Sequence, residues 1–194
     1  MPKKGKLIQG VGVNDVKGST EPGAPTTYYY TRWHGMLGRA YSSRGYSGIT
    51  YDGVTVCDSW LVFSNFKSWM ISQENIIGDL TNHQLDKDII IPGNKVYGPT
   101  TCRFISQPLN TLLNFQPKRK RSWPLGVSYD AAKHKFKSSI RISGVKKFLG
   151  YKETADAAHN SYLQAKIIEI VRQQKLQSDP RIILGLALHI LELL

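Results

Sequence analysis

The sequence has few cysteines, no long apolar run and few acidic residues, and each shortage excludes a class of protein. Its two cysteines, Cys57 and Cys102, form no Cys-x-x-Cys pair, so neither a disulfide scaffold nor a thiolate zinc site is expected. No run of 18 or more apolar residues occurs, and the basic start at residues 1–6 is not followed by the apolar core of a signal peptide. We therefore expect a cytoplasmic chain that does not enter a membrane.

The composition indicates a folded and strongly basic protein. With 194 residues, of which 41% are hydrophobic, the chain is long enough for one full domain or two small ones and too apolar to be disordered. Lys and Arg number 26 against 14 Asp and Glu, a net charge of +12. Residues 117–152 contain 11 basic and 1 acidic side chain, so nearly all of the excess lies there. Such a concentration of charge favours a polyanionic partner.

The first half of the chain predicts a helical core followed by a ββα unit. Residues 1–27 are rich in Gly, Pro, Lys and Thr, which predicts a flexible basic arm. In residues 28–41 and 59–70, aromatic and apolar residues recur every three or four positions, as in helices that face a core. A short strand is expected at 54–57 and a longer one at 85–91. A turn at 92–95 should lead into a return strand at 96–97, and a helix is expected at 107–114.

The second half predicts a three-stranded antiparallel sheet packed on one helix. The basic segment 117–122 is the expected boundary between a domain at 28–116 and a domain at 123–176. Strands are expected at 125–129, 135–142 and 145–151, and Thr154 is expected to cap a helix over 155–175. Residues 135–142 alternate, with Phe136, Ile140 and Ile142 inward and Lys135, Lys137, Ser139 and Arg141 outward. The fold class is thus α+β, with the positive charge on the open face of the sheet.

Residues 177–194 predict a final apolar helix that begins after Ser178-Asp179-Pro180. Arg181, His189 and Glu192 interrupt it, and it is too short to span a bilayer. It is expected either to pack on its own domain or to form a homodimer through residues 180–194.

The second domain resembles the DNA-binding domain of plant Apetala and ethylene-response transcription factors over about residues 123–172. The resemblance depends on Gly126-Val127-Ser128-Tyr129, Lys135-Phe136-Lys137-Ser138-Ser139-Ile140, Lys147-Phe148-Leu149-Gly150-Tyr151 and the run from Thr154 to Tyr162. It implies that the sheet enters the major groove of duplex DNA. The matching outward positions are Lys133, Lys135, Lys137, Arg141, Lys146 and Lys147, and the linker adds Lys118, Arg119, Lys120 and Arg121. Lysine favours phosphate contacts over base reading.

The first half resembles a group of phage HNH homing endonucleases, several of which carry the same basic strand domain behind the nuclease unit. The resemblance depends on Trp33, Met36, Arg39, Tyr41, Val56-Cys57, Trp60, Phe63-Ser64-Asn65-Phe66, Leu85-Asp86-Lys87-Asp88, Gly93-Asn94, Tyr97, Pro99, Cys102 and Asn110. It implies a ββα-metal unit that binds one divalent cation, Mg²⁺ or Mn²⁺.

The resemblance also implies roles for individual residues. Asp86 is the expected metal carboxylate, Asp88 a second ligand, and Asn110 or Asn114 the ligand from the helix. Asn94 is expected to hold the loop. Lys87 occupies the place of the general-base histidine, and a protonated lysine cannot accept a proton. His83 could replace it only if the chain bends between them, because an extended strand would place it about 13 Å away.

Three functions remain open at this point. The first is a site-specific, metal-dependent DNA endonuclease of the homing type, in the cytoplasm of a host cell if the chain is phage-encoded. The second is a non-catalytic DNA-binding protein with a decayed nuclease unit, which the missing histidine favours. The third is an RNA-binding protein.

Overall fold

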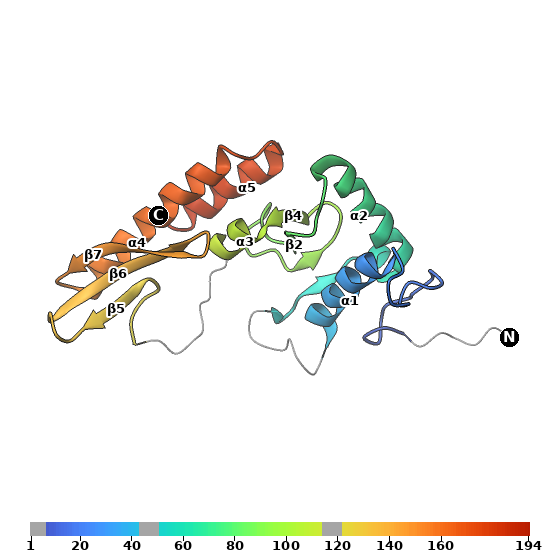
Figure 1. Ribbon diagram of the computed structural model, residues 1–194, viewed down its shortest axis with the longest axis horizontal. Coiled ribbons are helices and arrows are strands. Elements are labelled where there is room, and N and C mark those ends of the chain that lie inside the picture. Colours follow the sequence, from blue (N-terminus) through green and yellow to red (C-terminus); the bar gives the residue numbers. More distant parts are fainter. Residues whose placement is uncertain (1–6, 43–50, 114–121) are drawn as a thin grey trace. The chain divides into compact units, whose positions relative to one another are not determined.

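The computed structural model describes residues 7–42, 51–113 and 122–194 and divides the chain into two compact units, 1–104 and 105–194. Figure 1 labels the helices and strands of each. The chain is α+β, as predicted, with five α-helices in the described residues and a three-stranded antiparallel sheet. No helix of the described ranges is long and apolar enough to cross a membrane.

The first unit is built around two helices. Its elements are α1 (Thr27–Tyr41), β1 (Thr55–Val56), the 3₁₀ helix η2 (Asp58–Leu61), α2 (Phe63–Ile77), β2 (His83–Asp86) and β3 (Val96–Tyr97), and the division between the units falls within β4 (Arg103–Ser106). The two predicted helices are confirmed, although the second starts as a 3₁₀ turn and continues to Ile77.

The core of this unit is aromatic, as the helical spacing predicted. Trp33, Trp60, Phe63 and Phe66 are buried, and the Trp33 indole N–H donates to the Trp60 carbonyl oxygen at 2.7 Å. This bond satisfies the one polar group that the Trp33 ring brings into the core. Ring contacts join Trp33 to Phe63 and Trp60 to Phe66, with centroids 5.3 and 5.0 Å apart.

The strands of the first unit do not pair as the sequence predicts. In place of a hairpin between 85–91 and 96–97, β3 pairs in parallel with β1, and β2 forms a separate two-stranded sheet with β4. The predicted strand ends at Asp86, because the chain turns there. The simple ββα hairpin is therefore wrong, although a helix does follow β4.

The predicted flexible arm is wrong for residues 7–27, which pack on the first unit. Val13 forms a parallel bridge with Val62, just before α2. Asp15 accepts the backbone N–H of Ser64 at 2.9 Å, so it satisfies a donor in the first turn of α2. Gly12 lies against the side chains of Trp33 and Leu37. The polar composition hid these contacts, which join residues far apart in sequence.

Replacing Gly12 with alanine is expected to lower the free energy of unfolding by about 1–2 kcal/mol, since overpacking a core is destabilising. The added methyl carbon would lie 2.4 Å from Cδ1 of Leu37 and 2.9 Å from the Trp33 ring. Urea denaturation measures the change. Gly35→Ala within α1 is the matched control and should be neutral or stabilising, because its nearest neighbour would lie 3.8 Å away. Equal effects of the two substitutions would contradict the packed position of Gly12.

The second unit contains the predicted sheet and helix. It comprises α3 (Gln107–Leu113), β5 (Val127–Asp130), β6 (Lys135–Ile142), β7 (Val145–Lys152), α4 (Ala155–Gln174) and α5 (Pro180–Leu191). The strands pair antiparallel in the order β5-β6-β7. Thr154 caps α4 by accepting the Ala157 N–H at 3.1 Å, as predicted.

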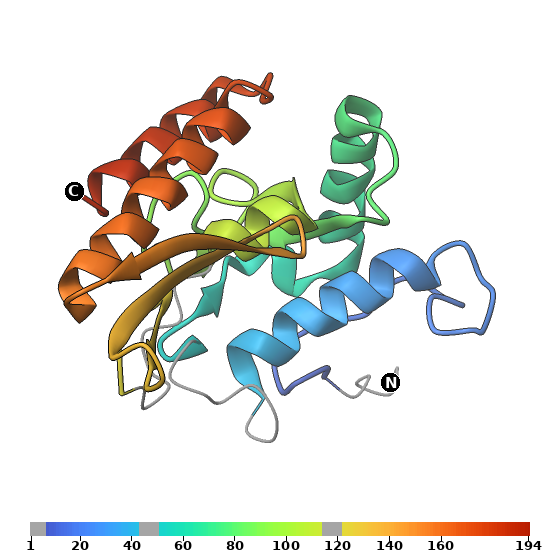
Figure 2. The same ribbon diagram turned by 60° about the vertical axis from the view of Figure 1, so that its left-hand side comes forward.

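Helix α4 covers one face of this sheet, and α5 lies alongside α4 (Figures 1 and 2). The Ser138 hydroxyl donates to the Ala158 carbonyl oxygen at 2.8 Å and joins β6 to α4. At Gly126, where φ is +82°, an added Cβ would lie 2.3 Å from the Tyr162 ring, so only glycine fits. Because α3 packs against β6 and α4, the unit begins at residue 105 and not at the predicted linker 117–122, most of which lies outside the described residues.

Candidate functional site

Asp86 ends β2 and turns the chain with its own side chain. Its Oδ1 accepts the backbone N–H of Asp88 at 2.9 Å and that of Ile89 at 2.7 Å. Two such bonds to one carboxylate favour a turn over a continued strand. The carboxylate therefore lies at the start of a loop. The sequence predicted that Asp88 would share a strand face with Asp86, and this is wrong because Asp88 lies within the turn.

Asn94 closes this loop at its far end. Its side-chain Nδ2 donates to the carbonyl oxygens of Lys87 at 2.7 Å and Val96 at 2.8 Å. One amide thus bridges the two ends of the segment 87–96, because both of its N–H donors are used within the loop. These bonds hold the loop, which is the positioning role expected of Asn94.

Lys87 is a largely buried lysine. Its side chain is only 10% exposed, and its ammonium group lies 3.1 Å from Oδ2 of Asp88. An ammonium group has three donors and no acceptor. In this position Lys87 pairs with Asp88 and orients its carboxylate.

The pKa of Asp86 is raised to about 7. Burial is the largest cause, and the negative charge of Asp88 raises this pKa further. The hydrogen bonds from the backbone of Asp88 and Ile89 act in the opposite direction. Two adjacent carboxylates in a partly buried place are stabilised by a proton or by a cation. Burial and the neighbouring charge therefore both favour the neutral form of Asp86.

This pKa shift predicts how stability depends on pH. The folded chain holds a proton on Asp86 that the unfolded chain has lost, so stability falls as pH rises from about 4 to about 7. The contribution is fully present below about pH 4. Asp86→Asn should remove this slope and melt at a higher temperature than the natural chain at pH 8, but not at pH 4. Thermal melts from pH 4 to 8 test it, with the exposed Asp52→Asn as a control that keeps the slope.

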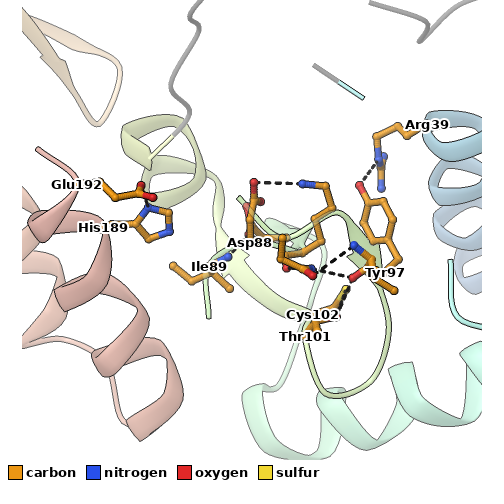
Figure 3. Close-up of polar contacts among 12 residues, drawn as sticks. Arg39, Asp88, Ile89, Tyr97, Thr101, Cys102, His189 and Glu192 are labelled. Carbon is orange, nitrogen blue, oxygen red and sulfur yellow. Dashed lines mark hydrogen bonds and ion pairs between the residues drawn. The ribbon is translucent and has the colours of Figure 1, made fainter. Parts of the chain in front are cut away.

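The residues that follow the loop are hydrogen-bonded, and two of them, Tyr97 and Cys102, are buried. Tyr97 accepts a hydrogen bond from Arg39 at 3.0 Å, and Thr101 donates to the Val96 carbonyl oxygen at 2.8 Å (Figure 3). Burial raises the pKa of the Cys102 thiol to about 12, so it stays protonated as a small core side chain. Over the described ranges, no group of three or more His, Cys, Asp or Glu side chains could hold a metal ion.

The other predicted catalytic and binding residues lie elsewhere along the chain. His83 is the first residue of β2, and the turn made by Asp86 follows at the end of that strand. Asn110 lies on α3 in the second unit. Asn114, Lys118, Arg119, Lys120 and Arg121 lie outside the described residues. Within one unit, the structure brings together Asp86, Lys87, Asp88 and Asn94.

The sheet of the second unit presents a positive face opposite α4. Ser138 and Ile140 of β6 are buried beneath α4, so the alternate positions point to the open face. Cross-strand pairing brings further residues to that face. We call this the open face; it comprises Ser128, Asp130, Lys135, Lys137, Ser139, Arg141, Lys146, Phe148 and Tyr151. Lys135 forms an ion pair with Glu153 at 2.7 Å, so Lys137, Arg141 and Lys146 supply most of its uncompensated charge.

Two aromatic residues of the open face were missed by the sequence analysis. Phe148 is 54% exposed, and its ring centroid lies 5.1 Å from that of Tyr151. The Nζ atoms of Lys137 and Lys133 lie 5.4 and 4.3 Å from the Phe148 and Tyr151 rings. Residues 148 and 151 would fall on opposite faces of a regular strand, but a bulge opposite Ser138 and Ser139 brings both to one face. The alternation of residues along a regular strand could not have revealed that the two rings share a face.

Lys147 was predicted on the open face, and the register corrects this. It pairs with Ile140, a buried residue of the α4 side. Its positive charge also contributes to the lowered pKa of Glu169 on α4, after the larger effect of the Arg172 hydrogen bond. Lys147 therefore belongs to the helix-covered side of the sheet.

Comparisons of the chain with protein-family models, with curated proteins and with solved structures gave no match.

Proposed function

We propose that this protein binds duplex DNA through the open face of its β5-β6-β7 sheet and hydrolyses the DNA at Asp86. The observation that carries the binding part is the segregation of Lys137, Arg141 and Lys146 on one side of a sheet whose other side is covered by a helix. A rigid sheet that carries lysines matches a phosphate backbone and releases its counterions. Phe148, exposed between these cations, offers an apolar contact to a base or sugar.

The hydrolytic part depends on the pair Asp86 and Asp88. Carboxylate oxygens are the ligands that Mg²⁺ and Mn²⁺ prefer, and the mutual repulsion of this pair fits a divalent cation. When bound, such an ion would stabilise negative charge on the phosphate and on the leaving oxygen. Asn94 would keep the loop in shape, and Lys87 would orient Asp88.

A second candidate is a DNA-binding protein without catalysis. It is favoured by Lys87, which occupies the place of the general base and is engaged in an ion pair. This protein would use the same open face on DNA, and its binding would not depend on a divalent cation.

One experiment separates these functions. The chain is incubated with a plasmid library of the source genome, with Mg²⁺ or with EDTA, and both binding and cleavage are followed over a range of salt. Cleavage that occurs with Mg²⁺ and not with EDTA supports the nuclease. Binding that is equally tight with Mg²⁺ and with EDTA, without cleavage in either, supports the second candidate. Preference for structured RNA over duplex DNA in competition, or no binding at low salt, would contradict both.

A further inference from the structure

The C-terminal helix α5 has an apolar face that the described residues of its unit leave exposed. Ile182 and Leu186 are buried on the side that faces α4. On the other side, Leu184, Leu188 and Leu191 are 63%, 37% and 66% exposed. Their spacing of four and three residues places them in one stripe along the helix.

Opposite charges stand at the two ends of this stripe. Arg181 precedes the leucines and Glu192 follows them, and their side chains are 61% and 60% exposed. Eleven residues separate the two, which is about three helical turns, so both lie on the side of the leucines and about 17 Å apart along the axis. The stripe therefore has an arginine at one end and a glutamate at the other.

We propose that this stripe binds the stripe of a second copy of the chain, with the two α5 helices antiparallel. In that arrangement the leucines interdigitate, and each Arg181 meets Glu192 of the partner subunit. A parallel pair would instead place like charges together at both ends. The contact is isologous, so it closes as a two-fold dimer.

The pairs that these charges already form are compatible with the contact. Asp179 accepts from Nε and Nη2 of Arg181 at 3.2 Å, but a guanidinium group has five N–H donors. His189 lies 3.9 Å from Glu192, on the edge of the stripe. A membrane surface is a poorer occupant, because α5 has no flanking row of Lys and Arg. The inference goes beyond the proposed function and requires no DNA.

Sedimentation velocity over a concentration series, without DNA, tests whether the chain dimerises through the leucine stripe of α5. Leu184→Glu should raise the dimer dissociation constant by about a hundredfold or more, since each copy would bury a charge in the apolar seam. Ile76→Glu, at a 77% exposed position on α2, is the matched control and should leave the constant unchanged. A chain that stays monomeric at its highest soluble concentration, or equal effects of the two variants, would overturn the proposal.

A charge exchange tests the antiparallel orientation. Arg181→Glu and Glu192→Arg alone should each weaken the dimer several-fold, and the double variant should restore it, because the opposite charges then meet again. Circular dichroism of each variant verifies that α5 is formed. A double variant as weak as the two single ones would overturn the antiparallel pairing. Vesicle binding that Leu184→Glu abolishes, without self-association, would overturn the proposal as a whole.

Discussion

Replacing Asp86 with asparagine is expected to reduce Mg²⁺-dependent cleavage by about a thousandfold or more, because preorganised electrostatic groups contribute on that order. Asparagine keeps the shape of the side chain and an oxygen that can accept the N–H of Asp88 and Ile89. It removes the charge that would hold the cation. Single-turnover cleavage of a defined duplex measures the change, and affinity for the same duplex should stay within about twofold of the natural chain.

The control for this prediction is a second aspartate of the first unit. Asp52 lies exposed in a turn, so Asp52→Asn removes the same charge away from the loop and should cleave normally. Asp88→Asn should also lower cleavage, since Asp88 is the second carboxylate of the pair. If Asp86→Asn and Asp52→Asn cleave equally well, the cutting centre lies elsewhere.

The cleavage rate should also rise with pH. A protonated Asp86 cannot serve as an anionic ligand, and its pKa is raised to about 7 by burial and by Asp88. At low Mg²⁺ the rate should therefore increase between pH 6 and pH 8. A high Mg²⁺ concentration should move this rise to lower pH, because the cation competes with the proton for the same carboxylate.

Removing two lysines from the open face is expected to weaken binding to duplex DNA by about tenfold to a hundredfold at physiological salt, as these charges would neutralise phosphates. The variant is Lys137→Gln with Lys146→Gln, at two positions of the open face. The slope of the logarithm of the binding constant against the logarithm of salt should fall by about 2, since each phosphate contact contributes about 0.9. Fluorescence anisotropy in a salt series gives both quantities.

The opposite side of the same sheet provides the matched control. Lys147 and Lys152 pair with Ile140 and Phe136, on the side that α4 covers. The double variant Lys147→Gln with Lys152→Gln loses the same net charge and should retain most of the salt slope. Equal losses in the two double variants would mean that net charge alone, and not the open face, attracts DNA.

Local pattern was sufficient for much of this fold. Aromatic residues at helical spacing predicted α1 and α2, and alternation of lysine with apolar residues predicted β6. Thr154 and Asp179 were readable as helix caps, since a cap depends on residues three or fewer positions away. Such features are encoded within a few residues, so a single sequence is enough to find them.

Long-range pairing was not readable in the same way. The pairing of β3 with β1 joins residues about forty positions apart, and the docking of Gly12 on Trp33 and Leu37 depends on the finished core. The end of β2 was missed because Asp86 uses its side chain to turn its own backbone. A hydrophobic pattern contains no sign of that bond.

By itself, the sequence determined the α+β class, the helices, the three-stranded sheet and the place where positive charge gathers, because each depends on spacing and composition along the chain. Only the tertiary structure decided which lysines share the open face, that a bulge adds Phe148 and Tyr151 to it, and that Lys87 is engaged with Asp88. The physical reason is that strand register and burial are set by contacts between distant segments, and these form only when the chain has folded.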